Sequence, residues 1–193
     1  GYLGLGSAMA MLGMRYGDQR SLAFTEAVTR EMALENWRQA LELSSEEDYL
    51  QRGAAAALLA LVAWSNGDLK EACRFYPESI ERLQRAGHIT DAIGCTLSLA
   101  DICITQGRLR EAMSTYEQGL QLAMAHGGLV LRGAADMHVG MSELFREQND
   151  LEAATQHLLR SREFGEFTGL PQNRYRWRVA MARIREAQGE FDS

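Results

Sequence analysis

The chain has 193 residues, 46% of them hydrophobic, and carries a formal net charge of −6 with a pI of about 5.3. An acidic surface of this kind repels phosphate backbones, so we expect no direct contact with DNA. The longest apolar run, residues 53–64, is well short of the roughly 20 residues that cross a bilayer, so no membrane segment is expected. The three cysteines form no CxxC pair, which favours a reducing, cytoplasmic location.

Helix-forming residues dominate the whole chain. Ala, Leu, Met, Glu, Arg and Gln lose little side-chain freedom in a helix, and only two prolines interrupt them. No segment alternates apolar and polar residues over the length of a strand. We therefore predict an all-α chain with helices, in chain order, at residues 3–16, 19–43, 47–66, 69–86, 91–106, 109–126, 129–148, 151–167 and 172–188.

The first 44 residues show the weakest pattern. A turn motif, GDQRSL, begins at Gly17, but its next copy starts 50 residues further on. We predict a degenerate helical pair over residues 1–44 and an array of repeats over residues 45–193. Ser44 and Ser45 precede acidic residues and predict a helix start of the capping-box type at this boundary.

Beyond this boundary the chain repeats itself. The turn motif reads GDLKEA at Gly67, GRLREA at Gly107, NDLEAA at Asn149 and GEFDS at Gly189, with starts 40, 42 and 40 residues apart. A Gly or Asn adopts the left-handed conformation that ends a helix. Asp68 and Asp150 are then placed to cap the following helix. Each unit is therefore predicted to be helix, tight turn, helix, with three complete pairs before the last turn motif.

Two residues of the middle helices carry specific predictions. Pro77 lies inside the helix predicted at 69–86, cannot donate an N–H to the carbonyl of Cys73, and crowds that turn at a cost of about 3 kcal/mol. We expect this helix to kink or break there. Thr90 is expected to cap the helix that follows.

The last turn motif is cut short after five residues. We read the chain as a piece of a longer protein, with the second helix of the last repeat missing. On the preceding helix, part of the apolar set Val179, Ala180, Met181 and Ile184 would then lose its cover. Because uncovered apolar surface recruits another surface, we expect a homo-oligomer formed through this helix, with exchange of the N-terminal helices as one route.

The repeat units resemble tetratricopeptide repeats. With the turn Gly or Asn as position 15, the small residue of position 8 is matched by Ala60, Ala100, Ser142 and Ala182, and that of position 20 by Ala72, Ala112 and Ala154. The aromatic of position 24 is matched by Tyr76 and Tyr116, whereas Leu158 departs from it and Trp at position 4 is absent. The ~40-residue period exceeds the ordinary one of about 34. The stretches 90–123, 131–161 and 169–192 are similar to repeats of MalT-like, ATP-dependent LuxR-type transcriptional regulators.

This resemblance implies a right-handed α-solenoid of antiparallel helix pairs. It also implies a non-catalytic sensor domain that binds a small-molecule inducer or a protein or peptide partner and controls self-association. Such regulators carry an ATP-binding switch module and a DNA-binding helix-turn-helix, so ATP is expected in the whole protein and no cofactor in this part. The alternative is a free-standing scaffold that binds a partner's peptide or helix.

The sequence shows no catalytic or metal-binding arrangement. It contains no HExxH motif and no cluster of His and Cys with metal-ligand spacing. A Ser–His–Asp arrangement cannot be argued from it either, so we expect the chain not to be an enzyme. His138 lies on an apolar helix face and is expected to be a core histidine.

A polar groove is the candidate site. The resemblance implies that the first helix of each pair lines the concave side, with positions 2, 5, 9, 12 and 13 facing inward. The candidate groove residues are Trp64, Asp101, Asp136, Glu143, Arg146, Arg176 and Arg183. Two interpretations stay open: a site for a polar ligand or peptide, or structural ion pairs Asp136–Arg176 and Glu143–Arg183 between repeats, each worth about 0–1 kcal/mol if exposed.

Overall fold

The computed structural model describes residues 5–45, 48–126, 133–164 and 173–189. Its helices are α1 Leu5–Met11, α2 Gln19–Leu43, α3 Tyr49–Ser65, α4 Leu69–Arg85, α5 Ile89–Thr105, α6 Leu109–Ala125, α7 Ala134–Glu147, α8 Leu151–Glu163 and α9 Asn173–Gln188. No strand occurs in these four ranges. The predicted all-α solenoid is confirmed.

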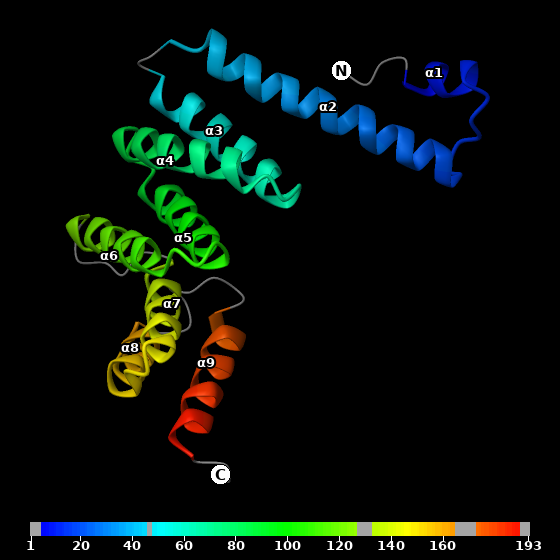
Figure 1. Cartoon of the computed structure of the whole chain (residues 1–193). Helices are drawn as coiled ribbons and strands as arrows, with labels where there is room; N and C mark the ends of the chain where they lie inside the picture. The colour runs from blue at the N-terminus through cyan, green and yellow to red at the C-terminus, as the bar shows by residue number, and fades with distance from the viewer. Residues whose placement is uncertain (1–4, 46–47, 127–132, 165–172, 190–193) are drawn as a thin grey trace.

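Helices α3 to α8 form three successive pairs, as predicted (Figure 1). Each helix packs against the next one in the chain, and α9 packs against both α7 and α8. Helices α3, α5, α7 and α9 line one side of the stack, while α4, α6 and α8 form the other (Figure 1). This first side is the concave face.

The turn motifs behave as the sequence predicted. Gly67, Gly107 and Asn149 have φ values of 79°, 72° and 60°, in the left-handed region that ends a helix. The carboxylates of Asp68 and Asp150 each accept the backbone N–H three residues on, at 3.0 Å. These contacts satisfy N–H groups that have no partner within their own helix, so each turn sets the start of the next helix.

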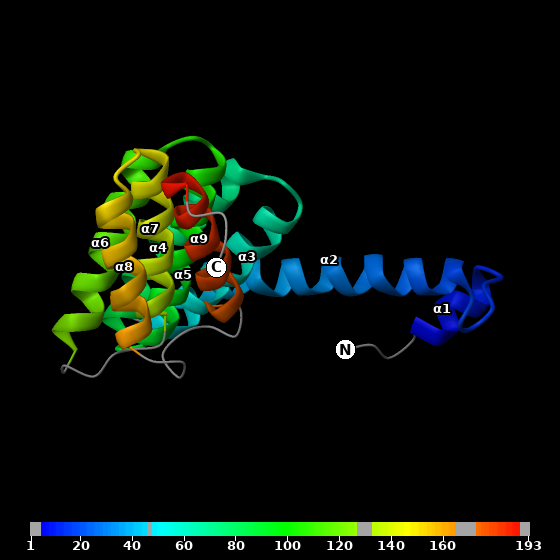
Figure 2. The same ribbon diagram turned by 90° about the horizontal axis from the view of Figure 1, so that it is seen from below.

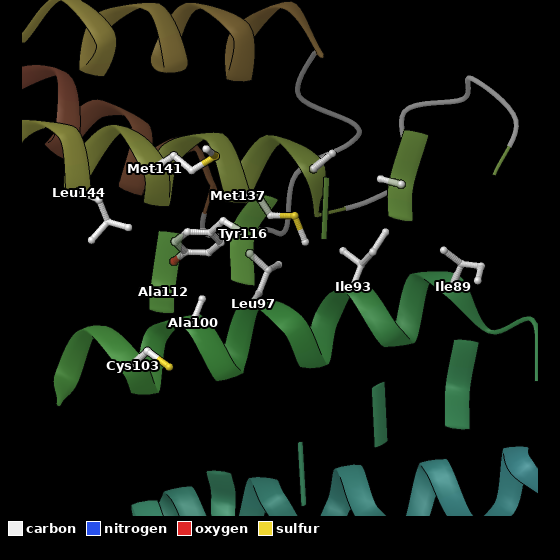
Figure 3. Packing of buried hydrophobic residues seen from close by; sticks show 12 residues of the cluster. Ile89, Ile93, Leu97, Ala100, Cys103, Ala112, Tyr116, Met137, Met141 and Leu144 are labelled. Atoms are coloured by element: carbon white, nitrogen blue, oxygen red, sulfur yellow. The ribbon is translucent and has the colours of Figure 1, made fainter. Parts of the chain in front are cut away.

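Most small residues of the repeat pattern are buried where helices pack, whereas Ala182 of α9 is exposed. Fully buried small residues are Ala60, Ala72, Ala100, Ala112, Ser142 and Ala154. One turn after each buried alanine of the second helices, a large residue fills the core: Tyr76, Tyr116 or Leu158. Figure 3 shows the Tyr116 ring between residues of α5, such as Leu97, and residues of α7, such as Met141. Full burial of one such side chain stabilises the fold by roughly 1.5–3 kcal/mol.

Several predicted helix starts need correction. Helix α5 begins at Ile89, so His88 and not Thr90 is the residue before its first turn. Asp48 caps α3 by accepting the N–H of Gln51, whereas Ser44 ends α2 and starts no helix. His88 and Asp48 have similar backbone angles, with φ −85° and ψ 63° at His88 and φ −81° and ψ 67° at Asp48, and of the two Asp48 adds a side-chain cap.

The bounds of two other helices also differ from the prediction. Helix α1 ends at Met11 because Gly13, with a φ of 65°, turns the chain left-handed. Helix α7 begins at Ala134, after Gly133 with a φ of 102°. The predicted helical residues 129–132 and 165–167 lie outside the described ranges.

The break predicted at Pro77 is wrong, because α4 continues through this residue, while the alternative, a kink, stays a prediction. Pro77 lies on the exposed face of the helix, while the flanking Tyr76 and Ser79 are buried. Helix α4 packs against both α3 and α5. This packing outweighs the hydrogen bond that proline removes.

The predicted loss of cover on α9 affects one part of its apolar set and not the other. Ala180 and Ile184 are fully buried in a cluster with Val139 of α7 and Leu158 of α8. Val179 remains exposed and Met181 is partly buried. The preceding repeat therefore covers Ala180 and Ile184 but leaves Val179 open, and association through this helix stays a prediction.

Helix α2 departs from the stack. It is 25 residues long, against 17 for each of α3 to α6, and Ser21 is its one buried residue. Figure 2 shows α2 extending away from the other helices, with α1 beside its far end. We call α1 and α2 together the arm. The predicted boundary after residue 44 stays a prediction. Among the helices of the described ranges, none combines the length and apolar character that a membrane crossing requires.

Candidate functional site

An open well of about 620 Å³ lies between α3 and α5 on the concave face. Helix α3 contributes an apolar stripe at helical spacing: Leu50, Ala54, Ala57, Leu58 and Leu61. Helix α5 contributes the opposite wall: Thr90, Asp91, Gly94, Leu97 and Ser98. The three exposed leucines of the stripe have exposed fractions between 37% and 48%. Leucine at that exposure gains free energy when a ligand covers it.

The well is apolar apart from one carboxylate. Asp91 is the charged side chain among the described residues that line it. Burial raises the pKa values of Tyr76 and Cys95, which also reach the well, so both are neutral at physiological pH. The arrangement suits a ligand with apolar groups and at most one cation.

Gly94 leaves empty space in the wall of α5. A Cβ atom built at this position would meet no atom within 4 Å. The neighbouring small residues Ala54, Ala57 and Ser98 likewise keep the well open. A larger side chain at position 94 would therefore occupy the well without disturbing the packed core.

The concave face becomes charged one turn further along α5. Tyr116 of α6 donates a hydrogen bond to Oδ1 of Asp101 at 3.1 Å. The Nη2 atom of Arg176, from α9, lies 3.7 Å from the same oxygen. Arg183 of α9 donates to Oε1 of Glu143, on α7, at 3.0 Å. These side chains connect four helices, and we call them the charged cluster.

The electrostatics of the charged cluster keep its members in fixed states. Burial raises the pKa of Tyr116, and the carboxylate of Asp101 raises it further, so the phenol stays neutral. Burial disfavours the charged form of Arg176, but Asp101, Tyr116 and Glu143 together outweigh this and raise its pKa. The cluster therefore consists of a neutral donor and paired opposite charges.

Four of the predicted groove residues come together in this cluster: Asp101, Glu143, Arg176 and Arg183. Of the two ion pairs that the structural interpretation predicted, Glu143–Arg183 is present, whereas Arg176 lies beside Asp101 and not as predicted beside Asp136. A role of these residues in ligand binding stays a prediction.

The remaining predicted groove residues lie elsewhere. Asp136 is fully buried, so the prediction that it faces an open groove is wrong; α9 packs against α7 here. Trp64 is partly buried and packs edge-on against Tyr76, with ring centroids 6.4 Å apart. Arg146 pairs with its neighbour Glu147. None of the three lines the well.

Sequence reasoning missed the well itself. The same position rule, at positions 2, 5 and 9, gives Ala54, Ala57 and Leu61 on α3, and Gly94 and Leu97 on α5. All five line the well. The prediction followed charged residues, whereas the open surface is recognised by small and apolar residues at inward positions.

A histidine pair connects α7 and α8. The Nδ1 atoms of His138 and His157 lie 2.9 Å apart, so one ring donates and the other accepts. Phe164 stacks on His138 and Phe145 on His157, with centroids 5.3 and 5.1 Å apart. Burial, with smaller contributions from His157 and Arg160, lowers the pKa of His138 to about 4. His138 is thus the core histidine that the sequence predicted.

Within the described ranges, no three His, Cys, Asp or Glu side chains gather as metal ligands would. The histidine pair has two stacked phenylalanines as its ring neighbours. We therefore assign it to packing between helices.

Comparisons with known proteins agree with the architecture. The model of the MalT-like TPR region matches residues 20–193. A search of the curated proteins gave no match. The crystal structure of BtubC (BKLC) from P. vanneervenii is similar, with a TM-score of 0.69, 18% identity, and coverage of 90% of this chain and 69% of that one. A Podosopora anserina protein described as a kinesin light chain with nearly identical TPR-like repeats has a TM-score of 0.60, 16% identity, and coverage of 88% and 83%. At these identities the likeness shows the fold.

Proposed function

The chain belongs to the family of MalT-like TPR regions, and from that premise we propose that it is the sensor and interaction domain of a LuxR-type transcriptional regulator. In this proposal the domain catalyses no reaction. It binds an inducer or a partner and thereby controls self-association of the whole protein. The observation that carries the binding function is the open apolar well between α3 and α5.

The well is a better binding surface than the charged cluster. In the charged cluster, Asp101 and Glu143 already contact arginines of α9, so a ligand would have to displace those contacts. In the well, leucine side chains face solvent, and covering them stabilises a complex by about 25 cal/mol per Å² of apolar surface. Between an inducer rich in polar groups and a polypeptide segment with apolar side chains, this chemistry favours the polypeptide.

Binding is tested with a random peptide library displayed on phage. Peptides selected on the chain are titrated against Gly94→Leu, which fills the well, and Gly94→Ala, its matched control. We expect Gly94→Leu to lose at least tenfold in affinity, which equals about 1.4 kcal/mol or more, and Gly94→Ala to lose none. Equal affinity for both variants would place binding elsewhere.

The regulator assignment is tested by the open reading frame around this sequence. A phosphate-binding GxxxxGK[ST] motif before these residues and a helix-turn-helix after them would support it. ATP would then be the cofactor of the switch module. A reading frame that encodes the repeats without either module would overturn it.

A free-standing scaffold for a partner's peptide or helix is the second candidate. It is favoured by the fold that the chain shares with the Podosopora anserina light chain. The reading frame separates the two candidates, because both use the same well for binding.

A further inference from the structure

A second exposed apolar surface lies at the tip of the arm. Met11 and Tyr16 are 88% and 92% exposed, and Leu12 and Leu22 are also exposed. We call these four residues the arm tip. Met11 and Tyr16 are the most exposed of the large apolar side chains on the described surface, and uncovered apolar clusters mark interaction sites.

The arm tip is held in a defined shape. The N–H groups of Leu12, Gly13 and Met14 donate to carbonyls of α1, which closes the end of this helix. Asp18 caps α2 by accepting the N–H of Ser21 at 2.7 Å, and Ser21 in turn accepts the N–H of Gly17. A surface ordered before binding loses less conformational entropy when it docks.

The arm tip and the well are complementary. Both surfaces are apolar, and the exposed cations Arg15 and Arg20 flank the arm tip, whereas the well carries the carboxylate of Asp91. Asp18, the acidic residue next to the arm tip, already caps α2 by accepting the N–H of Ser21. In Figure 2 the arm tip lies far from the stack, so it is presented outward, away from the well of its own chain.

We propose that the arm tip of one copy of this chain docks in the well between α3 and α5 of a second copy. The contact is head-to-tail: it joins two different surfaces and either closes as a reciprocal pair or extends into a chain. It uses the same well as the proposed function, so a bound partner and a docked arm exclude each other. The contact itself needs no partner.

Light scattering on the purified chain tests this proposal. The arm variant carries Leu12→Asp with Tyr16→Asp, and the well variant carries Gly94→Leu. We expect the unmodified chain to show a mass at least twice that of the monomer, rising with concentration, and each variant alone to be monomeric. An equimolar mixture of the two variants should restore a species of two chains, because one still has its arm tip and the other its well.

Three comparisons keep the result interpretable. Tyr175→Asp, at an exposed residue of α9, should associate like the unmodified chain, and circular dichroism checks that every variant folds. If Gly94→Leu fails to fold, Leu61→Asp replaces it. A monomeric unmodified chain, or a mixture that stays monomeric, overturns the docking proposal. If the monomeric chain still binds peptides, the proposed function stands although the docking proposal fails. If the chain associates but binds no peptide, the docking proposal stands although the proposed function fails.

Discussion

The two ends of helix α5 face the concave side with opposite properties. Near its start, Asp91, Gly94 and Ser98 line a well that is open and apolar. One turn later, Asp101 is held by Tyr116 and lies beside Arg176 of α9. The same face of one helix thus passes from an open surface to a closed one. A charge at an inward position of this stack can be paired by a neighbouring repeat, as Glu143 of α7 is by Arg183 of α9.

The difference between the two ends is sharpest at two glycines. Gly94 borders empty space, whereas a Cβ atom at Gly140 of α7 would lie 2.4 Å from the Tyr116 ring. We expect Gly140→Ala to lower the free energy of unfolding by about 3 kcal/mol, because Tyr116 has no room to move in a packed core. Gly94→Ala should raise it by up to about 1 kcal/mol through helix propensity. Urea denaturation measures both, and similar effects at the two glycines would contradict the comparison.

Lowering the pH should destabilise the fold where the histidine pair joins α7 and α8. The pKa of His138 is lowered to about 4 in the folded chain from an ordinary value of 6.5, and that of His157 is lowered too. The unfolded chain therefore takes up more protons below pH 6.5. The contribution of the neutral histidines to the free energy of unfolding is complete above that pH and is lost as the pH falls toward 4. For His138 we expect a loss of about 2 kcal/mol between pH 7 and pH 5.

The double variant His138→Phe with His157→Phe isolates this effect from the titration of carboxylates. Its free energy of unfolding should depend on pH less steeply than that of the unmodified chain between pH 5 and pH 7. His126→Gln, at the exposed residue that follows α6, is the matched control and should keep the full pH dependence. Identical slopes for the double variant and the control would remove the histidine pair as the cause.

Two aspartates on α5 test the same contrast through charge. Asp101→Ala removes the acceptor of the Tyr116 hydroxyl and the partner of Arg176, so it should cost roughly 1–2 kcal/mol of stability. Asp91→Ala, at the rim of the well, should change stability by less than about 0.5 kcal/mol, since it loses a favourable charge in the first turn and an exposed contact to His88. Thermal unfolding of the two variants would contradict this account if Asp91→Ala were the more damaging.

The smallest effect is expected at the exposed pair of the charged cluster. Arg183 and Glu143 have side chains that are 51% and 28% exposed. Arg183→Glu should therefore lower stability by about 1 kcal/mol or less, and adding Glu143→Arg should restore it. A larger loss, or no recovery in the double variant, would mean that Arg183 has another role in the fold.

Local chemistry made most of the fold predictable. Turn residues such as Gly67 and caps such as Asp68 act within a few residues of themselves, so the sequence pattern located the helix pairs. Pro77 was misjudged because the packing of α4 between two neighbours is not visible in its own sequence.

The candidate site was only partly predictable, because it depends on what neighbouring helices cover. The pairing of Glu143 with Arg183 followed from their matching repeat positions. The burial of Asp136 did not, since it depends on where α9 packs. The well was missed because the prediction followed charged residues, although small residues such as Ala57 and Gly94 occupy inward positions of α3 and α5.

The central claim is that the open end of the concave face binds a partner and the closed end serves the fold. The most direct test measures the affinity of one library-selected peptide for Gly94→Leu and for Arg183→Glu by titration calorimetry. We predict at least a tenfold loss for Gly94→Leu and a change of less than about threefold for Arg183→Glu, equal to roughly 0.7 kcal/mol. Retained affinity in Gly94→Leu together with lost affinity in Arg183→Glu would place the binding site in the charged cluster and contradict this account.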